Sequence, residues 1–303
     1  MKIVVPASTA NLGAGFDSIG LALNLYLTLE VKGAEQWEVV PLSKELKVFP
    51  TDESHMIVKI AKEIAKEHGK ELNPCHISVR SDIPLARGLG SSAAAVVAGI
   101  ELADAVGELR LTLQEKLDLA TKLEGHPDNV GASLYGGLVV SCQTKDTVRL
   151  LPISDLPIEV ITIIPEKEWK TEDSRNALPS MLSFSEAVEA GAVSNVMVAA
   201  LLKKDWELAG EMMKDDRYHQ PYRKKFIPHY EEVEQIACRY GAFGVALSGA
   251  GPTIACYVEK ESSEWLYTQL SQAFPKMNIQ KLQISPSGVQ THQNDKKVRP
   301  SLL

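Results

Sequence analysis

The stretch PLARGLGSSAAAVVAGIELADAVG, residues 84–107, runs from a Gly-containing loop directly into an apolar helix. Gly88 and Gly90 allow the loop amides to turn inward, and the helix presents the positive end of its dipole to the loop. This pattern suits phosphate. It is not a Walker A loop, because no Gly-Lys-Ser/Thr follows, so a metal-binding hydroxyl would have to come from Ser91 or Ser92. Taken alone, the loop is explained equally well as a strand-to-helix turn in which Ser91 caps the helix.

The residues on either side predict a mixture of strands and helices. Small side chains at 91–107 suit close packing of that helix against a sheet. Residues 54–69 have an apolar helical face, and Thr112 with Glu115 forms a capping-box pattern ahead of helical spacing at Leu117, Leu119, Ala120 and Leu123. Strands are expected at 2–6, 21–31, 37–42, 76–84 and 135–142.

The pattern changes near residue 150. Beyond it, strands at 158–165, 243–249, 253–259 and 282–286 mix with helices that begin near Ser183 and Trp206 and with a helix over 229–241. We therefore predict an α+β fold of two domains, residues 1–150 and 151–303. The last stretch, 292–303, has the composition of a tail.

Composition excludes several function classes. The 303 residues carry a net charge of −7, and no dense basic run is present, which argues against binding to nucleic acid or to an anionic membrane. Four cysteines without CxxC spacing argue against a zinc site and a redox dithiol. The amino terminus lacks the features of a secretory signal, and no apolar run approaches membrane-spanning length by this reading, so we expect a cytoplasmic protein.

Two further Gly-rich stretches lie far from the first. In residues 6–23, Asn11 and Asp17 flank a turn that leads into an apolar strand; taken alone, a turn that uses both side chains to bind its own backbone is the simpler interpretation. In residues 247–258, Ser248, Gly249 and Gly251 form a tight turn that either allows close approach of a loop or ligand or simply joins two antiparallel strands.

The stretch KLEGHPDNVGAS, residues 122–133, crowds polar side chains between two helical patterns. Glu124 could complete a Mg²⁺ shell near a phosphate loop, because this ion takes one or two protein oxygens together with phosphates and water. Capping of a helix by Asp128 is the alternative.

Together these stretches resemble the GHMP kinase superfamily over nearly the whole chain. Its phosphate loop matches PxxxGLGSSA, its third signature matches SGAGPT, and NLGAGFDSIGL is most similar to the homoserine kinase branch. The resemblance implies an amino-terminal α+β domain, a ferredoxin-like carboxyl-terminal domain, and a homodimer. It also implies phosphorylation of L-homoserine by ATP with Mg²⁺, a step of threonine biosynthesis.

The resemblance also implies roles for individual residues. Arginine suits the substrate carboxylate because its donors form a flat fork, and an acidic side chain suits the ammonium. The implied positions are Pro84, Leu85, Ala86, Arg87, Gly88, Leu89, Gly90, Ser91, Ser92, Ala93 and Ala94 around the triphosphate, Ser92 and Glu124 on Mg²⁺, and Asn11, Asp17, His126, Thr171, Arg175 and Arg223 at the amino acid. Without the resemblance, both arginines would be surface salt-bridge partners.

Asn129 stands where mevalonate kinase-like relatives have a candidate aspartate base, so the resemblance implies catalysis by positioning, without a dedicated base. Asp128 and His126 are the residues that could overturn this hypothesis. The family more often has Asn at the position of His55, which leaves nucleotide selectivity open, and Arg87 either contacts the triphosphate or points to solvent. A GHMP kinase for another small alcohol, such as an isoprenoid precursor or shikimate, and a non-catalytic nucleotide- or amino-acid-binding protein are the alternatives.

Overall fold

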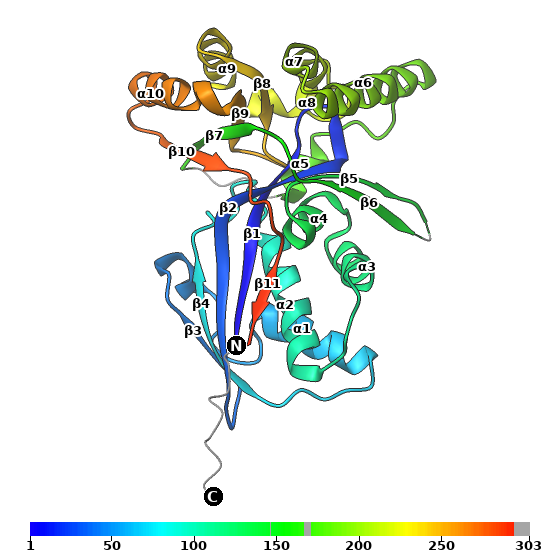
Figure 1. Ribbon diagram of the computed structural model, residues 1–303, viewed down its shortest axis with the longest axis vertical. Coiled ribbons are helices and arrows are strands. Elements are labelled where there is room, and N and C mark those ends of the chain that lie inside the picture. The colour runs from blue at the N-terminus through cyan, green and yellow to red at the C-terminus, as the bar shows by residue number, and fades with distance from the viewer. Residues whose placement is uncertain (146, 167–170, 294–303) are drawn as a thin grey trace, which may run out of the picture.

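The computed structural model describes residues 1–145, 147–166 and 171–293, with only the backbone described at 171–173. It contains two β-sheets, each with helices packed against it (Figure 1). The smaller sheet lies at the top of Figure 1 and the larger one below it. The predicted α+β class is confirmed.

The larger sheet has the order β11-β1-β2-β4-β3, and β5 pairs with both β2 and β6. Among the described strands of this sheet, only β3 and β4 pair in parallel. β1 is buried over most of its length, and β2 is buried mainly at Ile19–Leu23, where apolar residues dominate. The strands are β1 (Lys2–Asn11), β2 (Gly15–Gly33), β3 (Glu38–Pro41), β4 (Cys75–Ser81), β5 (Leu138–Gln143), β6 (Val148–Ile153) and β11 (Gln290–His292).

Within the described residues, two helices pack directly on one face of this sheet, and two more pack against them on the same side (Figure 1). They are α1 (Met56–Glu67), α2 (Ser91–Gly107), α3 (Leu113–Glu124) and α4 (Asp128–Tyr135). α2 packs against α1 and β1, as its small residues predicted, and Gly99 sits where a Cβ atom would lie 2.7 Å from the Ile60 side chain. This packing fixes the amino-terminal end of α2 against β1.

The smaller sheet is antiparallel, with the order β10-β7-β9-β8. Its strands are β7 (Ile158–Ile164), β8 (Ala242–Leu247), β9 (Ile254–Glu259) and β10 (Asn278–Gln283). Helices α9 (Tyr230–Arg239) and α10 (Ser263–Ala273) share an apolar core with one face. The remaining helices are α5 (Thr171–Asn176), α6 (Phe184–Lys203), α7 (Trp206–Lys214) and α8 (Gln220–Arg223), and the 3₁₀ helices are η1 (Lys44–Val48), η2 (Lys224–Phe226) and η3 (Lys260–Ser262).

The two sheets meet where β1 ends. The amide of Gly249, just after β8, donates to the carbonyl of Ala10 at 3.1 Å. Gly13, in the turn between β1 and β2, lies so close to α7 that a Cβ atom would be 2.4 Å from the carbonyl oxygen of Met213. The turn between β1 and β2 is thus held against the smaller sheet, next to the loop that precedes α2.

Several expected elements differ from those observed. The capping box of Thr112 and Glu115 is confirmed, but Leu123, expected on the apolar face of that helix, is 43% exposed, because α3 packs against α2 and α4 with its other side. A tail was expected from residue 292 onward, but His292 still belongs to β11, where it pairs with Lys2. Residues 294–303 of that tail lie outside the described part.

The expectation about apolar runs is also corrected. By length and composition alone, one helix of the described chain, α6, could cross a membrane. The mean hydropathy of its most apolar window is 1.3, and 28% of that window is buried. Its buried residues, Ala190, Met197, Ala200 and Leu201, lie on one side of the helix, and α6 contacts α7.

Candidate active site

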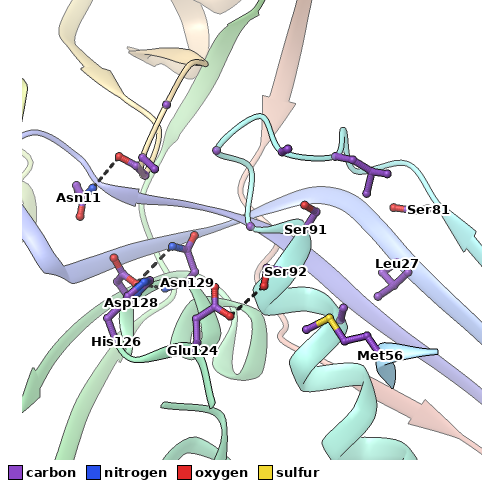
Figure 2. Close-up of a pocket in the computed structure, with 18 of the residues that line it drawn as sticks. Asn11, Leu27, Met56, Ser81, Ser91, Ser92, Glu124, His126, Asp128 and Asn129 are labelled. Atoms are coloured by element: carbon purple, nitrogen blue, oxygen red, sulfur yellow. Dashed lines mark hydrogen bonds and ion pairs between the residues drawn. The ribbon is translucent and has the colours of Figure 1, made fainter. Parts of the chain in front are cut away.

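A cavity of about 460 Å³ is lined by residues of the larger sheet and its helices, of α5 and α8, and of the turn after β8, and all four singled-out stretches contribute to it (Figure 2). Residues separated by up to 240 positions meet there, since Asn11 and Gly251 both line the cavity. Its lining includes the predicted positions Asn11, Asp17, Leu85, Ala86, Gly88, Gly90, Ser91, Ser92, Glu124, His126, Asn129, Arg175, Arg223, Gly249 and Gly251.

The loop before α2 has a backbone that requires glycine at two positions. Gly88 and Gly90 have φ of 79° and 71°. A Cβ atom on Gly88 would lie 2.3 Å from the carbonyl oxygen of Ser248, and the Ser248 hydroxyl donates to the carbonyl of Gly88 at 2.6 Å. The Gly-rich turn after β8 therefore supports the phosphate-type loop directly, which decides between the two interpretations left open for that turn.

The start of α2 also resolves the role of Ser91. The N-cap of α2 is Gly90, which has no side chain, so the alternative in which Ser91 caps the helix is wrong. The first amides of α2 are left to face the cavity, which suits an anion. The side chains of Leu89, Ala93 and Ala94 are fully buried in the core, and Arg87 donates to the carbonyl of Pro165 at 2.9 Å and so ties the loop to the end of β7.

Ser92 and Glu124 meet at the edge of the cavity. The Ser92 hydroxyl, on α2, donates to a Glu124 carboxylate oxygen at 3.1 Å at the end of α3 (Figure 2). Gly125 ends α3 in the left-handed region with φ of 94°, which turns the chain back toward the cavity. Two oxygen groups of the kind that Mg²⁺ prefers thus lie together beside the loop.

The other end of the cavity carries opposite charges. Arg175, on α5, donates to both carboxylate oxygens of Asp17 at 2.9 and 3.1 Å. Arg223, on α8, is 2% exposed and donates from Nε to the carbonyl of Ser174 at 3.1 Å. Burial, and next the charge of Arg175, lower the pKa of Arg223 to about 10, so it stays charged at neutral pH. The guanidinium groups lie 5.7 and 5.3 Å from the Phe16 ring centre.

Asn11 uses its amide to shape this region. Its Nδ2 donates to the carbonyl of Gly249 at 3.0 Å, and its Oδ1 accepts from the amide of Asp17 at 3.0 Å. Both residues have positive φ, 75° and 52°. Asn11 therefore holds the turn that presents the Asp17 carboxylate.

A row of polar groups crosses the start of α4, as Figure 2 shows. His126 Nδ1 lies 2.5 Å from Oδ1 of Asp128, and Asp128 is 1% exposed. Burial alone would lower the pKa of His126, but the hydrogen bond and charge of Asp128 outweigh it, and the pKa is raised. Asp128 also accepts from the backbone amide of Asn129 at 2.7 Å and thereby supports the first turn of α4.

Comparisons with known proteins agree with this geometry. Residues 55–137 match the GHMP kinases N terminal domain and residues 197–276 the GHMP kinases C terminal domain. The chain is 47% identical over 288 residues to homoserine kinase of Bacillus licheniformis, which covers 95% of this chain and 94% of that protein. It is 49% identical over 279 residues to homoserine kinase of Shouchella clausii, with 90% and 92% covered.

The chain belongs to the homoserine kinase family of GHMP kinases. Among solved structures, homoserine kinase from Cytophaga hutchinsonii has a TM-score of 0.84 at 26% identity and covers 96% of each chain. Mevalonate kinase of Methanococcus jannaschii is 20% identical to this chain, with a TM-score of 0.72, and the match covers 94% of this chain and 98% of that one. This likeness shows the fold alone. GHMP kinases are ATP-dependent small-molecule kinases, so ATP is the co-substrate.

Some features of this GHMP kinase site escaped the sequence analysis. Ser8, whose hydroxyl reaches Asn129, and Phe16, between the arginines, were not singled out, although both lie in the quoted stretch 6–23. The apolar end of the cavity, formed by Leu27, Phe49, Met56 and Val79 together with the predicted Leu85, had no sequence signal at the first four positions. His55 lines this end and caps α1 by accepting from the amide of Ile57 at 3.3 Å. Thr171 begins α5, and its side chain lies outside the described part.

Proposed function

We propose that the protein transfers the γ-phosphoryl group of ATP to the side-chain hydroxyl of L-homoserine, giving ADP and O-phospho-L-homoserine. The observation that carries the proposal is the charged end of the cavity, where Asp17 lies against Arg175 with Arg223 beside them. A substrate with both an ammonium and a carboxylate group would find a partner for each. The hydroxyl of homoserine would then extend toward the loop before α2.

The nucleotide would lie along the rest of the cavity. The amides of Gly88, Gly90 and Ser91 and the amino-terminal end of α2 would bind the phosphates, because these amides lack intrahelical partners. The apolar end near Phe49 and His55 would hold the base. Leu27 and Met56 lie at this end, on the far side of Ser92 from His126 (Figure 2).

We also propose that Ser92 and Glu124 hold Mg²⁺. The donor set fits, because the two side chains bring oxygens within 3.1 Å of each other at the border between the phosphate loop and the charged end. When bound, the ion would neutralise charge on the phosphate oxygens.

The chain's own residues would catalyse transfer by positioning. Asn129 cannot accept a proton, and the nearby Asp128 carboxylate already accepts from an amide and pairs with His126. Phosphoryl transfer needs little covalent help from the protein, so alignment and donors around the transferring group supply most of the catalysis. The substrate proton would pass to phosphate or water.

The test is release of ADP with ATP, Mg²⁺ and a panel of L-homoserine, L-serine, mevalonate and shikimate. We expect turnover with homoserine alone, and its loss in Arg175→Ala. Turnover with mevalonate or shikimate would overturn the substrate assignment, because neither gives the Asp17 carboxylate an ammonium partner. Absence of turnover with every compound would favour a binding protein. We further propose that the protein acts in the cytoplasm, where ATP is supplied, and as a homodimer.

A further inference from the structure

The hydroxyl of Ser8 contacts Asn129, a residue of the proposed site, from the side of β1. Ser8 is on β1 and is fully buried, and its Oγ lies 2.9 Å from Oδ1 of Asn129 in the first turn of α4. Asn129 itself lines the cavity. The two residues are 121 positions apart, so the contact depends on the packing of α4 against β1.

The neighbours of Asn129 fix which way its amide faces. Its Nδ2 lies 3.4 Å from Oδ1 of Asp128, a carboxylate oxygen that accepts hydrogen bonds only. The reverse orientation would place the amide oxygen against that carboxylate and leave two acceptors in contact. Ser8 must therefore donate to Oδ1, which leaves an N–H group of Asn129, and not its carbonyl oxygen, available to a ligand in the cavity.

Ser8 is also in contact with the loop before α2. Its amide donates to the carbonyl of Leu89 at 3.3 Å, and a Cβ atom on Gly90 would lie 2.2 Å from its hydroxyl oxygen. A single buried residue thus touches both the phosphate-type loop and Asn129, which lines the cavity.

We propose that Ser8 is a positioning residue that holds the amide of Asn129 with its N–H toward the reacting groups. Phosphoryl and hydroxyl oxygens accept hydrogen bonds, and a fixed donor is most effective where charge develops during transfer. This inference rests on the proposed function for its kinetic consequence, but the orientation of the amide does not depend on the substrate.

The chain supplies a matched control in Ser133. Its hydroxyl, one turn further along α4, is fully buried and donates to the carbonyl of Pro6 on β1 at 3.0 Å. Ser8→Ala and Ser133→Ala each remove one buried hydrogen bond between the same two elements. Only the first changes a group that lines the cavity.

We expect Ser8→Ala to lower kcat about tenfold, with the KM values for both substrates changed less than about twofold. Ser133→Ala should leave kcat unchanged at a similar loss of thermal stability. In an Asn129→Ala background, Ser8→Ala should have no further effect on kcat, because its action passes through that amide. Equal losses of kcat in the two serine variants, or a full effect in the Asn129→Ala background, would overturn the proposal.

A second readout is independent of turnover. The side-chain amide signal of Asn129 in a ¹⁵N NMR spectrum, assigned by its loss in Asn129→Ala, should shift in Ser8→Ala and stay in place in Ser133→Ala. An unmoved signal in Ser8→Ala would contradict the positioning role even if homoserine were not the substrate.

Discussion

The carboxylate of Asp17 and the guanidinium of Arg175 form a two-point ion pair across 158 positions of the chain, with a shortest separation of 2.9 Å. Each member is the proposed partner of one charge of the substrate. An amino acid entering the site would therefore exchange this pair for two new ones, to its ammonium and to its carboxylate. A ligand with one charge could satisfy only one of them.

Asp17→Asn should raise the KM for homoserine by about 10- to 100-fold, because a charged hydrogen bond to the ammonium is lost. The variant should also lose discrimination between homoserine and 4-hydroxybutanoate, which lacks the ammonium group. Initial rates measure both effects. Asp155→Asn, which removes an exposed partner of Lys204, is the control and should leave both constants unchanged. Undiminished preference for homoserine in Asp17→Asn would contradict the assignment.

Arg223→Ala should lower the free energy of unfolding by about 2–4 kcal/mol, because it leaves buried carbonyl groups without a charged donor. These acceptors include the carbonyls of Ser174 and Gly249. Arg217→Ala removes only an exposed ion pair with Glu189 and should cost much less. Urea unfolding of the two variants makes the comparison. Equal losses of unfolding free energy in the two variants would show that the burial of Arg223 contributes no stability.

Gly90→Ala should weaken ATP binding at least about tenfold, since the added Cβ atom collides with the Ser8 hydroxyl and displaces the loop. Gly69→Ala is the matched control. Gly69 has a similar φ of 68° but nothing within 4 Å of its Cβ position, so it should show only the backbone cost of about 1–2 kcal/mol. Isothermal titration with ATP separates them, and unchanged affinity in Gly90→Ala would argue against phosphate binding by this loop.

His219 should make the fold sensitive to acid. It is fully buried, with Nε2 3.0 Å from the carbonyl oxygen of Gly13, and burial lowers its pKa to about 4. Between about pH 6.5 and pH 4 the unfolded chain binds this proton more readily than the folded chain, so stability is lost as pH falls through that window. Urea midpoints at several pH values measure this loss. The slope should be smaller in His219→Gln, and an unchanged slope would assign the acid sensitivity to other groups.

The sequence predicted those features that are encoded locally. Glycines at 88 and 90 and the small residues after them predicted the loop and α2, and Thr112 with Glu115 predicted the start of α3. Edge strand β6 escaped because both of its faces are partly exposed, so it has no clean alternation. Helix α4 was indicated only as a second helical pattern after the polar stretch, because its eight residues are too few to define its bounds.

The candidate site was predicted in part for the same reason. Residue types at Asp17, Ser92 and Glu124 indicated chemistry by themselves, and the family resemblance pointed to the arginines. Contacts such as Ser8 with Asn129, or Asn11 with Gly249, join residues more than 100 positions apart and depend on how sheets and helices pack. No local pattern marks which of the two serines in residues 6–23, Ser8 or Ser18, faces α4.

The most direct test of the account is ³¹P NMR of the products formed from ATP, Mg²⁺ and L-homoserine by the wild-type protein. The account predicts a phosphate monoester signal that matches O-phospho-L-homoserine and grows in step with ADP. Formation of ADP with inorganic phosphate only, or no consumption of ATP under conditions in which ATP binds, would contradict it.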